Sequence, residues 1–406
     1  MARNWPSWSK CLTNQIDICG DDGMRIQEIC SSITDGSHNP PQGVTDSEYL
    51  MLSSKNIFDN NITFVDPRYL RKEDFEIEDR RTNIQAGDVL LTIVGTVGRC
   101  AVVPERAPKF TLQRSVAVLH PREDVCSSRF LMYALQGKRS YIEGRAKGVA
   151  QKGIYLGEVA NIEVPIPDKS TQAAIILRLD KIASIIQNRQ QQLSALDDLI
   201  KARFVEMFGD PVSNPKGWVK KALSDEAEIR IGPFGSLLHK EDYVSGGHAL
   251  VNPSHIIDGQ IVPDDELTVS DTKYTELSPY HLFPGDVVMG RRGEMGRCAV
   301  VEESGLLCGT GSLLIRTHGD LSADFIQKII SFPSFKRTIE DMAVGQTMPN
   351  LNVPIVSSFE IIKPPKSVQE RYYAFVAQID KSKSAIQKSL DETQLLFDSL
   401  MQQYFG

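Results

Sequence analysis

Two stretches of the chain place an apolar side chain at nearly every third or fourth position. The first runs from 175 to 207 and the second from 372 to 404, and neither contains an internal glycine or proline. This spacing lines up one face of a helix, so both stretches are predicted to be long helices. The positions on the two faces are Ile175, Leu179, Ile182, Ile186, Arg189, Leu193, Leu196, Ile200, Arg203 and Met207, then Tyr372, Val376, Ile379, Lys383, Ile386, Leu390, Thr393, Phe397, Leu400 and Tyr404.

A face that is apolar over more than four heptads needs a partner of similar length. One interpretation is that each helix packs only on its neighbouring domain. The other predicted helix is a better match in length, which favours a coiled coil. Arg189, Arg203 and Lys383 interrupt the apolar faces, and they are expected to fix the register or to face other subunits.

Outside these helices the pattern predicts short strands bounded by turns that contain glycine or proline. Each half of the chain also has one predicted helix among its strands, near 128–144 and near 323–342. Each half is therefore expected to contain a mixed α and β domain, called a head below. The predicted strands are 88–94, 100–103, 115–120 and 162–167, then 286–289, 298–301, 312–317 and 359–362.

The two halves are copies of one unit, offset by about 197 residues. Residues 87–105 and 285–303 are identical at eleven of nineteen positions. A period of this length indicates two whole domain-plus-helix units rather than a solenoid. We predict an α+β fold in which two pseudo-twofold-related heads are separated by two long antiparallel coiled-coil helices. The predicted boundaries are 1–168 for the first head, 169–209 for the first helix, 210–365 for the second head and 366–406 for the second helix.

This architecture predicts a molecule that holds two readers at a fixed spacing. A helix of about 38 residues is roughly 57 Å long at ~1.5 Å per residue. One turn of duplex DNA is about 34–36 Å long, so two heads at opposite ends suit two patches of one duplex.

The heads share a frame but differ in a turn. Residues 92–97 read Thr-Ile-Val-Gly-Thr-Val, whereas residues 290–295 read Gly-Arg-Arg-Gly-Glu-Met. Arg291 and Arg292 have the chemistry to bind guanine, and Glu294 to accept from the cytosine amino group. The alternative is an ordinary solvated charge cluster. The difference predicts that the two heads read different half-sites.

The composition is consistent with this architecture and indicates which classes of protein the chain can belong to. The 406 residues are 41% hydrophobic and 24% charged, with a net charge of −7, so any DNA contact depends on local basic loops. There is no apolar run long enough for a membrane span and no signal core at the N-terminus. The seven scattered cysteines favour reduced thiols, so a cytoplasmic location is expected, and the histidines show no metal-binding spacing.

Several segments, in order and in duplicate, resemble the family of type I restriction-modification specificity subunits over nearly the whole chain. Residues 34–41 resemble the family's early recognition turn, and residues 231–236 with 240–243 resemble its second copy. Residues 53–57 and 252–256 lie where the family has a loop before a strand, and 148–156 are similar to a segment before the last strand.

The resemblance implies two target-recognition domains that read an asymmetric, bipartite DNA site with an unspecified gap set by the helices. It implies a chain without catalytic activity that assembles with two methyltransferase subunits and, in the restriction form, with translocating nuclease subunits. S-adenosylmethionine and ATP would then bind to those partners. By matching motif positions, we expect DNA contacts from Ser37, His38, Lys55, Asn56, Thr96, Gln113, Arg114, Gln151 and Lys152, and from Ser236, Lys240, Asn252, Arg291, Arg292, Glu294 and Thr310.

The same sequence has three other interpretations. Residues 39–42, Asn-Pro-Pro-Gln, resemble part of an adenine methyltransferase motif, but the aromatic residue that stacks on a flipped base is missing. A helical-hairpin scaffold that binds no DNA explains the helices but not the divergent turns. A specificity subunit of a related type II-like or methylation-only system fits the same residues. The chain has no GxxxxGK[ST] phosphate-binding motif, which disfavours an ATP-driven motor.

Overall fold

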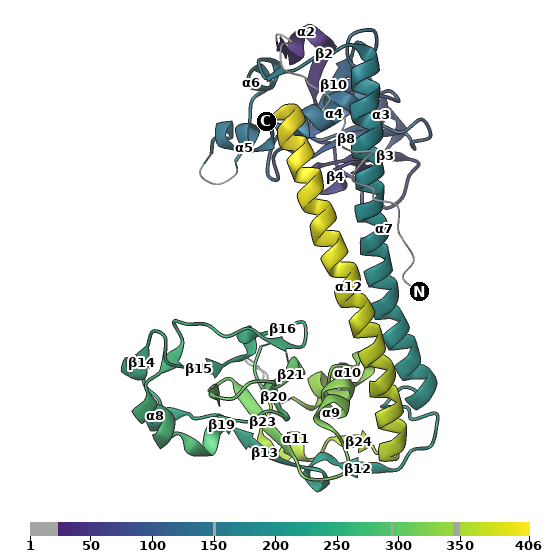
Figure 1. Cartoon of the computed structure of the whole chain (residues 1–406). Coiled ribbons are helices and arrows are strands. Elements are labelled where there is room, and N and C mark those ends of the chain that lie inside the picture. Colours follow the sequence, from purple (N-terminus) through teal and green to yellow (C-terminus); the bar gives the residue numbers. More distant parts are fainter. Residues whose placement is uncertain (1–22, 149–151, 294, 344–349) are drawn as a thin grey trace, which may run out of the picture. The chain divides into compact units, whose positions relative to one another are not determined.

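The computed structural model describes residues 23–148, 152–293, 295–343 and 350–406. The chain divides into two units, each of which is described by itself. The first unit contains residues 1–192 and 386–406, and the second contains residues 193–385. Each unit therefore consists of one head and part of each long helix (Figure 1).

The first head is built on a four-stranded antiparallel sheet that is buried on both faces. Because successive side chains of a strand point to opposite faces, each strand serves two cores. Val89 and Leu91 face a core shared with the helices, whereas Leu90 and Val118 face a second core under the remaining strands. The strand order is β2 (Cys30–Asp35), β10 (Val116–Pro121), β7 (Val89–Thr92) and β8 (Cys100–Val102).

The second head repeats this sheet and its division of side chains. Val287 and Met289 face the core that includes the helices, and Val288 and Leu314 face the other core. The duplication seen in the sequence is thus a duplication of topology. The order here is β13 (Ala227–Ile231), β23 (Ser312–Thr317), β20 (Asp286–Gly290) and β21 (Cys298–Val300).

A second sheet in each head contains one parallel pair of strands. In the first head β3 (Tyr49–Leu52) pairs with β9 (Phe110–Leu112), and in the second β15 (His248–Val251) pairs with β22 (Leu306–Cys308). Parallel strands end at the same edge, so the loops that follow them emerge side by side. The other strands are β1 (Met24–Arg25), β4 (Ile57–Phe58), β5 (Asn61–Ile62), β6 (Arg68–Leu70), β11 (Glu163–Val164), β12 (Lys220–Ala222), β14 (Tyr243–Val244), β16 (Ile256–Ile257), β17 (Gln260–Ile261), β18 (Thr268–Val269), β19 (His281–Leu282) and β24 (Glu360–Ile362).

The single helix expected in each head is in fact two helices. In the first head α4 (Ser128–Gly137) ends before α5 (Arg139–Arg145), and in the second α9 (Ala323–Ile330) ends before α10 (Pro333–Met342). Pro333 has no N–H to continue the preceding helix, so it begins a new one. The other short helices are α2 (Ile26–Ile29), α3 (Lys72–Thr82), α6 (Leu156–Ala160), α8 (Asp271–Glu276), α11 (Val353–Ser357) and the 3-10 turns η1 (Ser54–Asn56), η2 (Leu223–Asp225), η3 (Gly235–Leu237), η4 (Lys240–Asp242), η5 (Pro253–His255) and η6 (Ser278–Tyr280).

The two long helices, α7 (Lys169–Phe208) and α12 (Lys366–Phe405), run antiparallel. In the first unit Arg178, near the start of α7, donates to the hydroxyl of Tyr404, near the end of α12, at 3.2 Å. In the second unit Tyr372, near the start of α12, lies against Phe208 at the end of α7, with ring centroids 5.4 Å apart. The start of each helix therefore pairs with the end of the other, as the sequence predicted.

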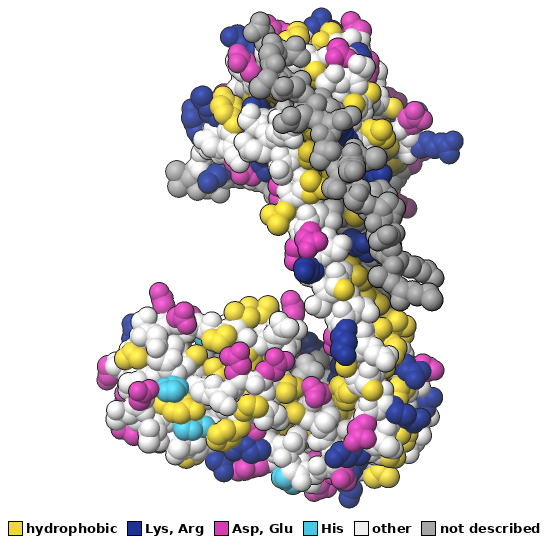
Figure 2. Space-filling view, in the orientation of Figure 1, with side chains coloured by type: hydrophobic (Ala, Val, Ile, Leu, Met, Phe, Trp, Pro, Cys, Tyr) yellow, Lys and Arg dark blue, Asp and Glu magenta, His cyan; other side chains and the backbone are white. Residues whose placement is uncertain are grey.

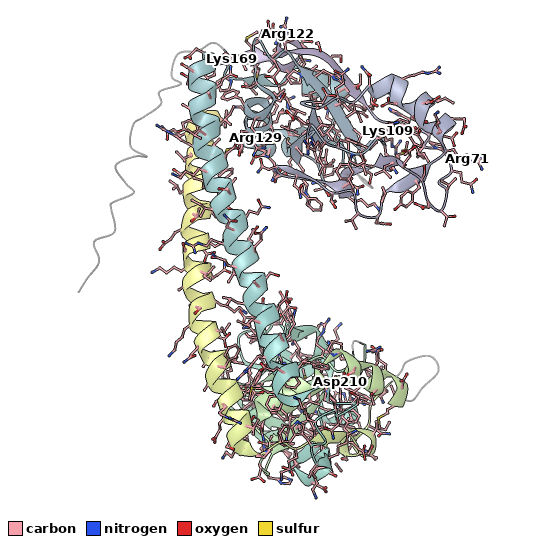
Figure 3. The ribbon with its side chains drawn as sticks, turned by 90° about the vertical axis from the view of Figure 1, so that its right-hand side faces the viewer. Arg71, Lys109, Arg122, Arg129, Lys169 and Asp210 are labelled. Atoms are coloured by element: carbon pink, nitrogen blue, oxygen red, sulfur yellow. The ribbon has the colours of Figure 1, made fainter. Side chains whose placement is uncertain are left out.

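The helices also pack on the heads. Arg129 of α4, labelled in Figure 3, donates to Asp180 of α7 at 2.8 Å. Leu179 of α7 is fully buried in the first core. Of the charged positions on the predicted faces, Lys383 forms an ion pair with Asp197 at 2.6 Å within the second unit. That pair joins the two helices, which suits a role in fixing their register. None of the described helices combines the length and the apolar composition needed to cross a membrane.

One buried carboxylate has a different partner in each head. Asp88 forms an ion pair with His120 at 2.7 Å, and the equivalent Asp286 pairs with Arg316 at 2.7 Å. The hydrogen bond with Asp88 raises the pKa of His120 above its ordinary value of 6.5. A raised pKa in the folded state stabilises the fold below the unfolded pKa, and this stabilisation is lost as pH rises through the folded value.

We therefore expect the first head to lose stability as pH rises through the neutral range above about 6.5, and His120→Arg to remove that loss. The arginine stays charged over this range, as it does at position 316. Thermal unfolding of both proteins across the pH range measures the difference. Equal pH dependence in the two proteins would contradict the prediction.

Candidate nucleic-acid interface

Loops that are distant in sequence meet at one end of the first head. The backbone N–H of Ser37 donates to Leu112 at 2.7 Å, Arg114 donates back to Ser37 at 2.9 Å, and Gln113 donates to Leu52 at 2.9 Å. These bonds join the loops after β2, β3 and β9. The parallel pairing of β3 and β9 brings their ends together, as expected for a parallel pair.

The divergent turn joins the same loops. Ile93 donates to the carbonyl of Ser115 at 2.9 Å, and Gly95 donates to the carbonyl of Lys152 at 3.0 Å. We call residues 36–38, 53–56, 93–98, 113–115 and 152–154 the first loop cluster. Backbone bonds hold its frame, so its exposed side chains are free to vary.

The structure divides the predicted contact residues of the first head into two groups. Asn56 is 1% exposed; its amide accepts from the N–H of Ser53 at 3.1 Å and donates to Val65 at 3.0 Å. Ser37 is buried as well. These two residues hold the loops, so burial argues against the direct DNA contacts expected of them. Exposed in the same cluster are His38, Lys55, Thr96, Arg114 and Lys152, with Gln113 half-buried, while Gln151 lies outside the described residues.

The second head has an equivalent set of loops, held in the same way. Gly232 donates to Ser312 at 3.1 Å, Gly309 donates to Val251 at 3.0 Å, and Arg291 donates to Gly311 at 3.0 Å. We call residues 232–236, 252–255, 290–293, 309–312 and 350–351 the second loop cluster. Its turn corresponds to the turn at 93–98 of the first cluster.

Arg291 and Arg292 have different surroundings, which the sequence did not predict. Arg291 is 7% exposed; its guanidinium donates to the carbonyl of Thr310 at 3.2 Å and to the side-chain oxygen of Asn350 at 3.0 Å. Burial, with the nearby Arg292 as a smaller cause, lowers the pKa of Arg291. Arg292 is exposed. Arg291 thus holds the turn in place. Its burial argues against the expected contact with guanine.

The remaining predicted residues of the second head have mixed positions. Asn252 is half-buried, and its side-chain oxygen accepts from Gly311 at 3.4 Å, which places it in the frame. Thr310 is half-buried in the same cluster, and Ser236 belongs to the cluster as part of η3. Lys240 is exposed in η4, which leads into β14 rather than into the cluster. Glu294 lies outside the described residues.

Two exposed aromatic residues beside the clusters were missed in the sequence. Tyr155 is 73% exposed next to the first cluster, and Phe234 is 61% exposed in the second. Phe234 occupies the position of His38, since Gly36 and Gly232 are equivalent in the two frames. Exposed rings give nucleic-acid bases a surface for stacking. In the sequence, an aromatic residue within a polar loop was the signal that could have identified them.

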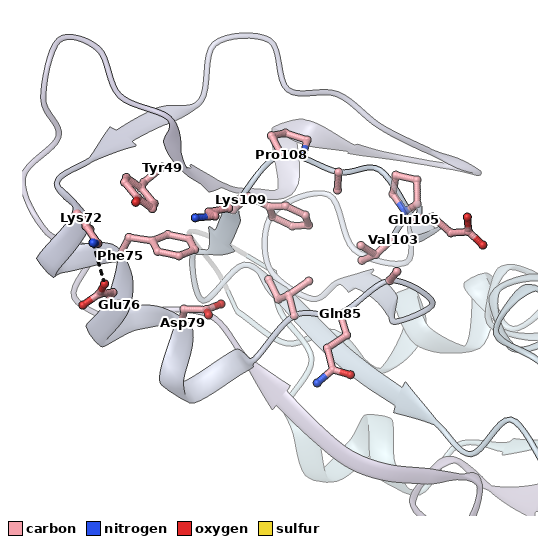
Figure 4. A pocket seen from close by; sticks show the side chains of 15 residues that line it. Tyr49, Lys72, Phe75, Glu76, Asp79, Gln85, Val103, Glu105, Pro108 and Lys109 are labelled. Carbon is pink, nitrogen blue, oxygen red and sulfur yellow. Dashed lines mark ion pairs between the residues drawn. The ribbon is translucent and has the colours of Figure 1, made fainter.

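Other features of the surface do not resemble a binding site of this kind. Basic and acidic side chains are interspersed on the face in Figure 2, so local loops must supply any affinity for phosphate. A pocket of about 550 Å³ lies beside Tyr49 and Phe110, the first residues of β3 and β9, and is shown in Figure 4. It is at the opposite end of these strands from the first loop cluster. Within the described ranges, no group of His, Cys, Asp or Glu side chains is placed to hold a metal.

Part of the chain matches a known family of domains, and more of it resembles known proteins. Residues 46–196 match the family model described as the type I restriction modification DNA specificity domain. The chain is 22% identical over 340 residues to the type I restriction enzyme MjaIX specificity subunit of Methanocaldococcus jannaschii, covering 78% of this chain and 76% of that one. Residues 46–196 are therefore a type I specificity domain, and most of the chain is similar to a type I specificity subunit. It is also 27% identical over 142 residues to the EcoBI specificity subunit of Escherichia coli, which covers 34% of this chain and only 30% of that subunit.

Solved structures from type I restriction-modification systems have a similar fold along nearly the whole chain. The type I restriction-modification S subunit from M. genitalium matches with a TM-score of 0.55 at 14% identity, covering 97% of this chain and 98% of that one. A second structure, titled for complex assembly and conformational transition of the type I system, matches with a TM-score of 0.59 at 15% identity, covering 95% and 97%. These likenesses establish the fold of the chain, with its α+β heads and long helices.

Proposed function

We propose that the chain reads a bipartite, asymmetric DNA site, with one loop cluster on each half. The observation that carries this proposal is that two equivalent backbone frames present different side chains. The exposed Arg292 replaces the half-buried Val94, and the exposed Phe234 replaces the exposed His38, although the hydrogen bonds that hold these positions are equivalent. A fixed frame with variable exposed residues is what recognition of two different sequences requires.

The long helices would set the unspecified gap between the half-sites. Each helix has 40 residues, and its half-buried positions recur every three or four residues through the central stretch, as in a paired helix. A continuous, paired helix resists bending, so the number of base pairs between the half-sites would be fixed.

The chain itself would have no catalytic role. Methylation, and cleavage where a nuclease subunit exists, would belong to partner subunits that bind S-adenosylmethionine and ATP. Repeat-equivalent exposed apolar residues support two copies of one partner. Leu199 is 45% exposed and its equivalent Leu396 is 38% exposed, while Phe58 and its equivalent Ile257 are 43% and 49% exposed. Apolar side chains exposed at matched positions indicate matched interfaces.

Methylome sequencing of a host that expresses the chain with its neighbouring methyltransferase tests the proposal. The expected result is a split adenine motif with an unspecified centre, and no methylation when either protein is expressed alone. A single uninterrupted motif, or methylation by the chain alone, would refute it. Methylation without any restriction of phage would assign the chain to a methylation-only system.

We predict that Leu199→Asp reduces the number of bound methyltransferase subunits from two to one, and that adding Leu396→Asp reduces it to none. A charge in a buried apolar contact should weaken the affinity of that site by at least roughly 30-fold. Native mass spectrometry of the co-expressed complex measures the stoichiometry.

Leu395→Asp is the matched control, because its repeat equivalent is already Asp198. Leu395 is 70% exposed, so the control places the same charge on the same helix at a position where the other copy tolerates it. Two bound partners are expected for this variant. Two bound partners in the Leu199→Asp variant would show that this face is not an interface.

A further inference from the structure

His38 is held by a carboxylate at the edge of the first loop cluster. Its Nε2 lies 2.8 Å from Oδ2 of Asp35, the last residue of β2. The His38 side chain is 52% exposed, whereas the Asp35 side chain is only 9% exposed. The imidazole of His38 therefore projects from the cluster, and the buried carboxylate of Asp35 anchors it.

Arg81 of α3 fixes that anchor. Its Nη2 donates to Oδ1 of Asp35 at 2.5 Å, and its Nε donates to the backbone carbonyl of Asp35 at 3.1 Å. Both carboxylate oxygens are thus engaged, one by Arg81 and the other by His38. The carboxylate has no freedom to turn away from the ring without breaking a charge-assisted bond.

This arrangement determines which imidazole nitrogen carries the proton. An ionised carboxylate only accepts hydrogen bonds, so Nε2 of His38 must be the donor. In the neutral ring, Nδ1 is then an acceptor. Within the described ranges, no group forms a hydrogen bond with Nδ1. When the ring is neutral, the described residues therefore leave one acceptor unused on a ring held in a fixed orientation.

We propose that His38 is a specificity-determining residue that accepts a hydrogen bond through Nδ1 from the amino group of adenine or cytosine. Asp35 and Arg81 are positioning residues that hold the ring in this tautomer. In the major groove only adenine N6 and cytosine N4 donate, whereas guanine and thymine present acceptors. Phosphate oxygens are also acceptors, so the neutral ring is mismatched to the backbone. This inference rests on the proposed function of the first loop cluster.

The second head has no equivalent of this network. Phe234 replaces His38 and Ile231 replaces Asp35 in the corresponding frame. The proposal therefore concerns the first half-site alone, and the second half-site provides an internal control in every experiment.

Methylome sequencing with the co-expressed methyltransferase tests the proposal through His38→Ala and Asp35→Asn. His38→Ala should lower discrimination at one position of the first half-site by roughly tenfold and leave the second half-site unchanged. An asparagine at 35 can donate its amide to Nε2, which moves the ring proton to Nδ1. Asp35→Asn should therefore abolish the selection of adenine or cytosine at that same position.

Three outcomes would overturn the proposal: an unchanged motif in His38→Ala, a uniform loss of methylation at all sites in that variant, and an unchanged base preference in Asp35→Asn. If the wild-type chain produces no split motif, the proposed function itself fails. Loss of folding is recognised separately, because a folded variant keeps its second half-site and its melting temperature.

The tautomer is measurable without DNA. In the full-length chain labelled with ¹⁵N-histidine, His38 should have its proton on Nε2, and its resonance is assigned by its absence in His38→Gln. Asp35→Asn should move the proton to Nδ1. A proton on Nδ1 in the wild-type chain would overturn the proposal, whereas a merely structural Asp35 would leave the tautomer unaffected by this substitution.

Discussion

Phe204→Ala is expected to destabilise the second unit by about 3–5 kcal/mol. Phe204 is 1% exposed, and its ring centroid lies 5.0 Å from that of Phe208, 6.0 Å from that of Phe325 and 5.6 Å from that of Tyr372. These rings come from α7, α9 and α12. Truncation leaves a cavity at the point where both long helices pack on the second head, and three elements lose contacts together.

Urea denaturation followed by Trp218 fluorescence measures this loss. The Trp218 indole donates to the carbonyl of Phe208 at 3.0 Å, so it reports on the same region. Trp218 becomes the sole tryptophan once Trp5 and Trp8 are replaced by phenylalanine. Val205→Ala is the matched control, because Val205 is the next residue and is 47% exposed. A loss below about 1 kcal/mol for Phe204→Ala would contradict this account of the packing.

Arg292→Ala is expected to weaken recognition of the second half-site by about 1–3 kcal/mol, which is roughly 5- to 150-fold. Arg292 is exposed, and its backbone is bridged to Asn350, while Arg291 holds the turn from beneath. A guanidinium on a fixed turn can form two hydrogen bonds with guanine without ordering a loop first. Binding of the co-expressed complex to duplexes that differ in one half-site measures the effect.

Arg337→Ala removes the same charge from an exposed position of α10 that is not part of the second loop cluster, and it serves as the control. It should leave discrimination at both half-sites unchanged. If Arg292→Ala weakened binding equally for all sequences and lowered the salt dependence by about one charge, Arg292 would be a phosphate contact instead.

The framework of this protein followed from local sequence patterns. The three-to-four spacing from Ile175 onward predicted both long helices, and the duplication of residues 87–105 predicted equivalent sheets. Antiparallel pairing followed from the symmetry of the repeat. The prediction of one continuous helix near 323–342 was wrong, because the chain forms two helices there. Pro333, which begins the second of them, was visible in the sequence.

The long helices show that sequence periodicity does not predict every buried position. Phe204 and Phe208 are not on the predicted face, yet both are fully buried against the second head. Near their ends the helices bury a second stripe of side chains, against a head as well as against each other. The spacing along one helix does not reveal how many neighbours it has.

The sequence by itself determined the repeat, the class of fold and the order of the elements, because these depend on periodicity and on comparison of the chain with itself. Only the tertiary structure decided which polar side chains are available to a ligand. The side-chain amide of Asn56 is occupied by its hydrogen bond to the carbonyl of Val65. The guanidinium of Arg291 is occupied by its hydrogen bond to Asn350, which is 59 residues away. His38 is oriented by an aspartate whose anchor, Arg81, lies on a separate helix. The exposure and orientation of a side chain depend on neighbours brought together by folding, and no local pattern encodes them.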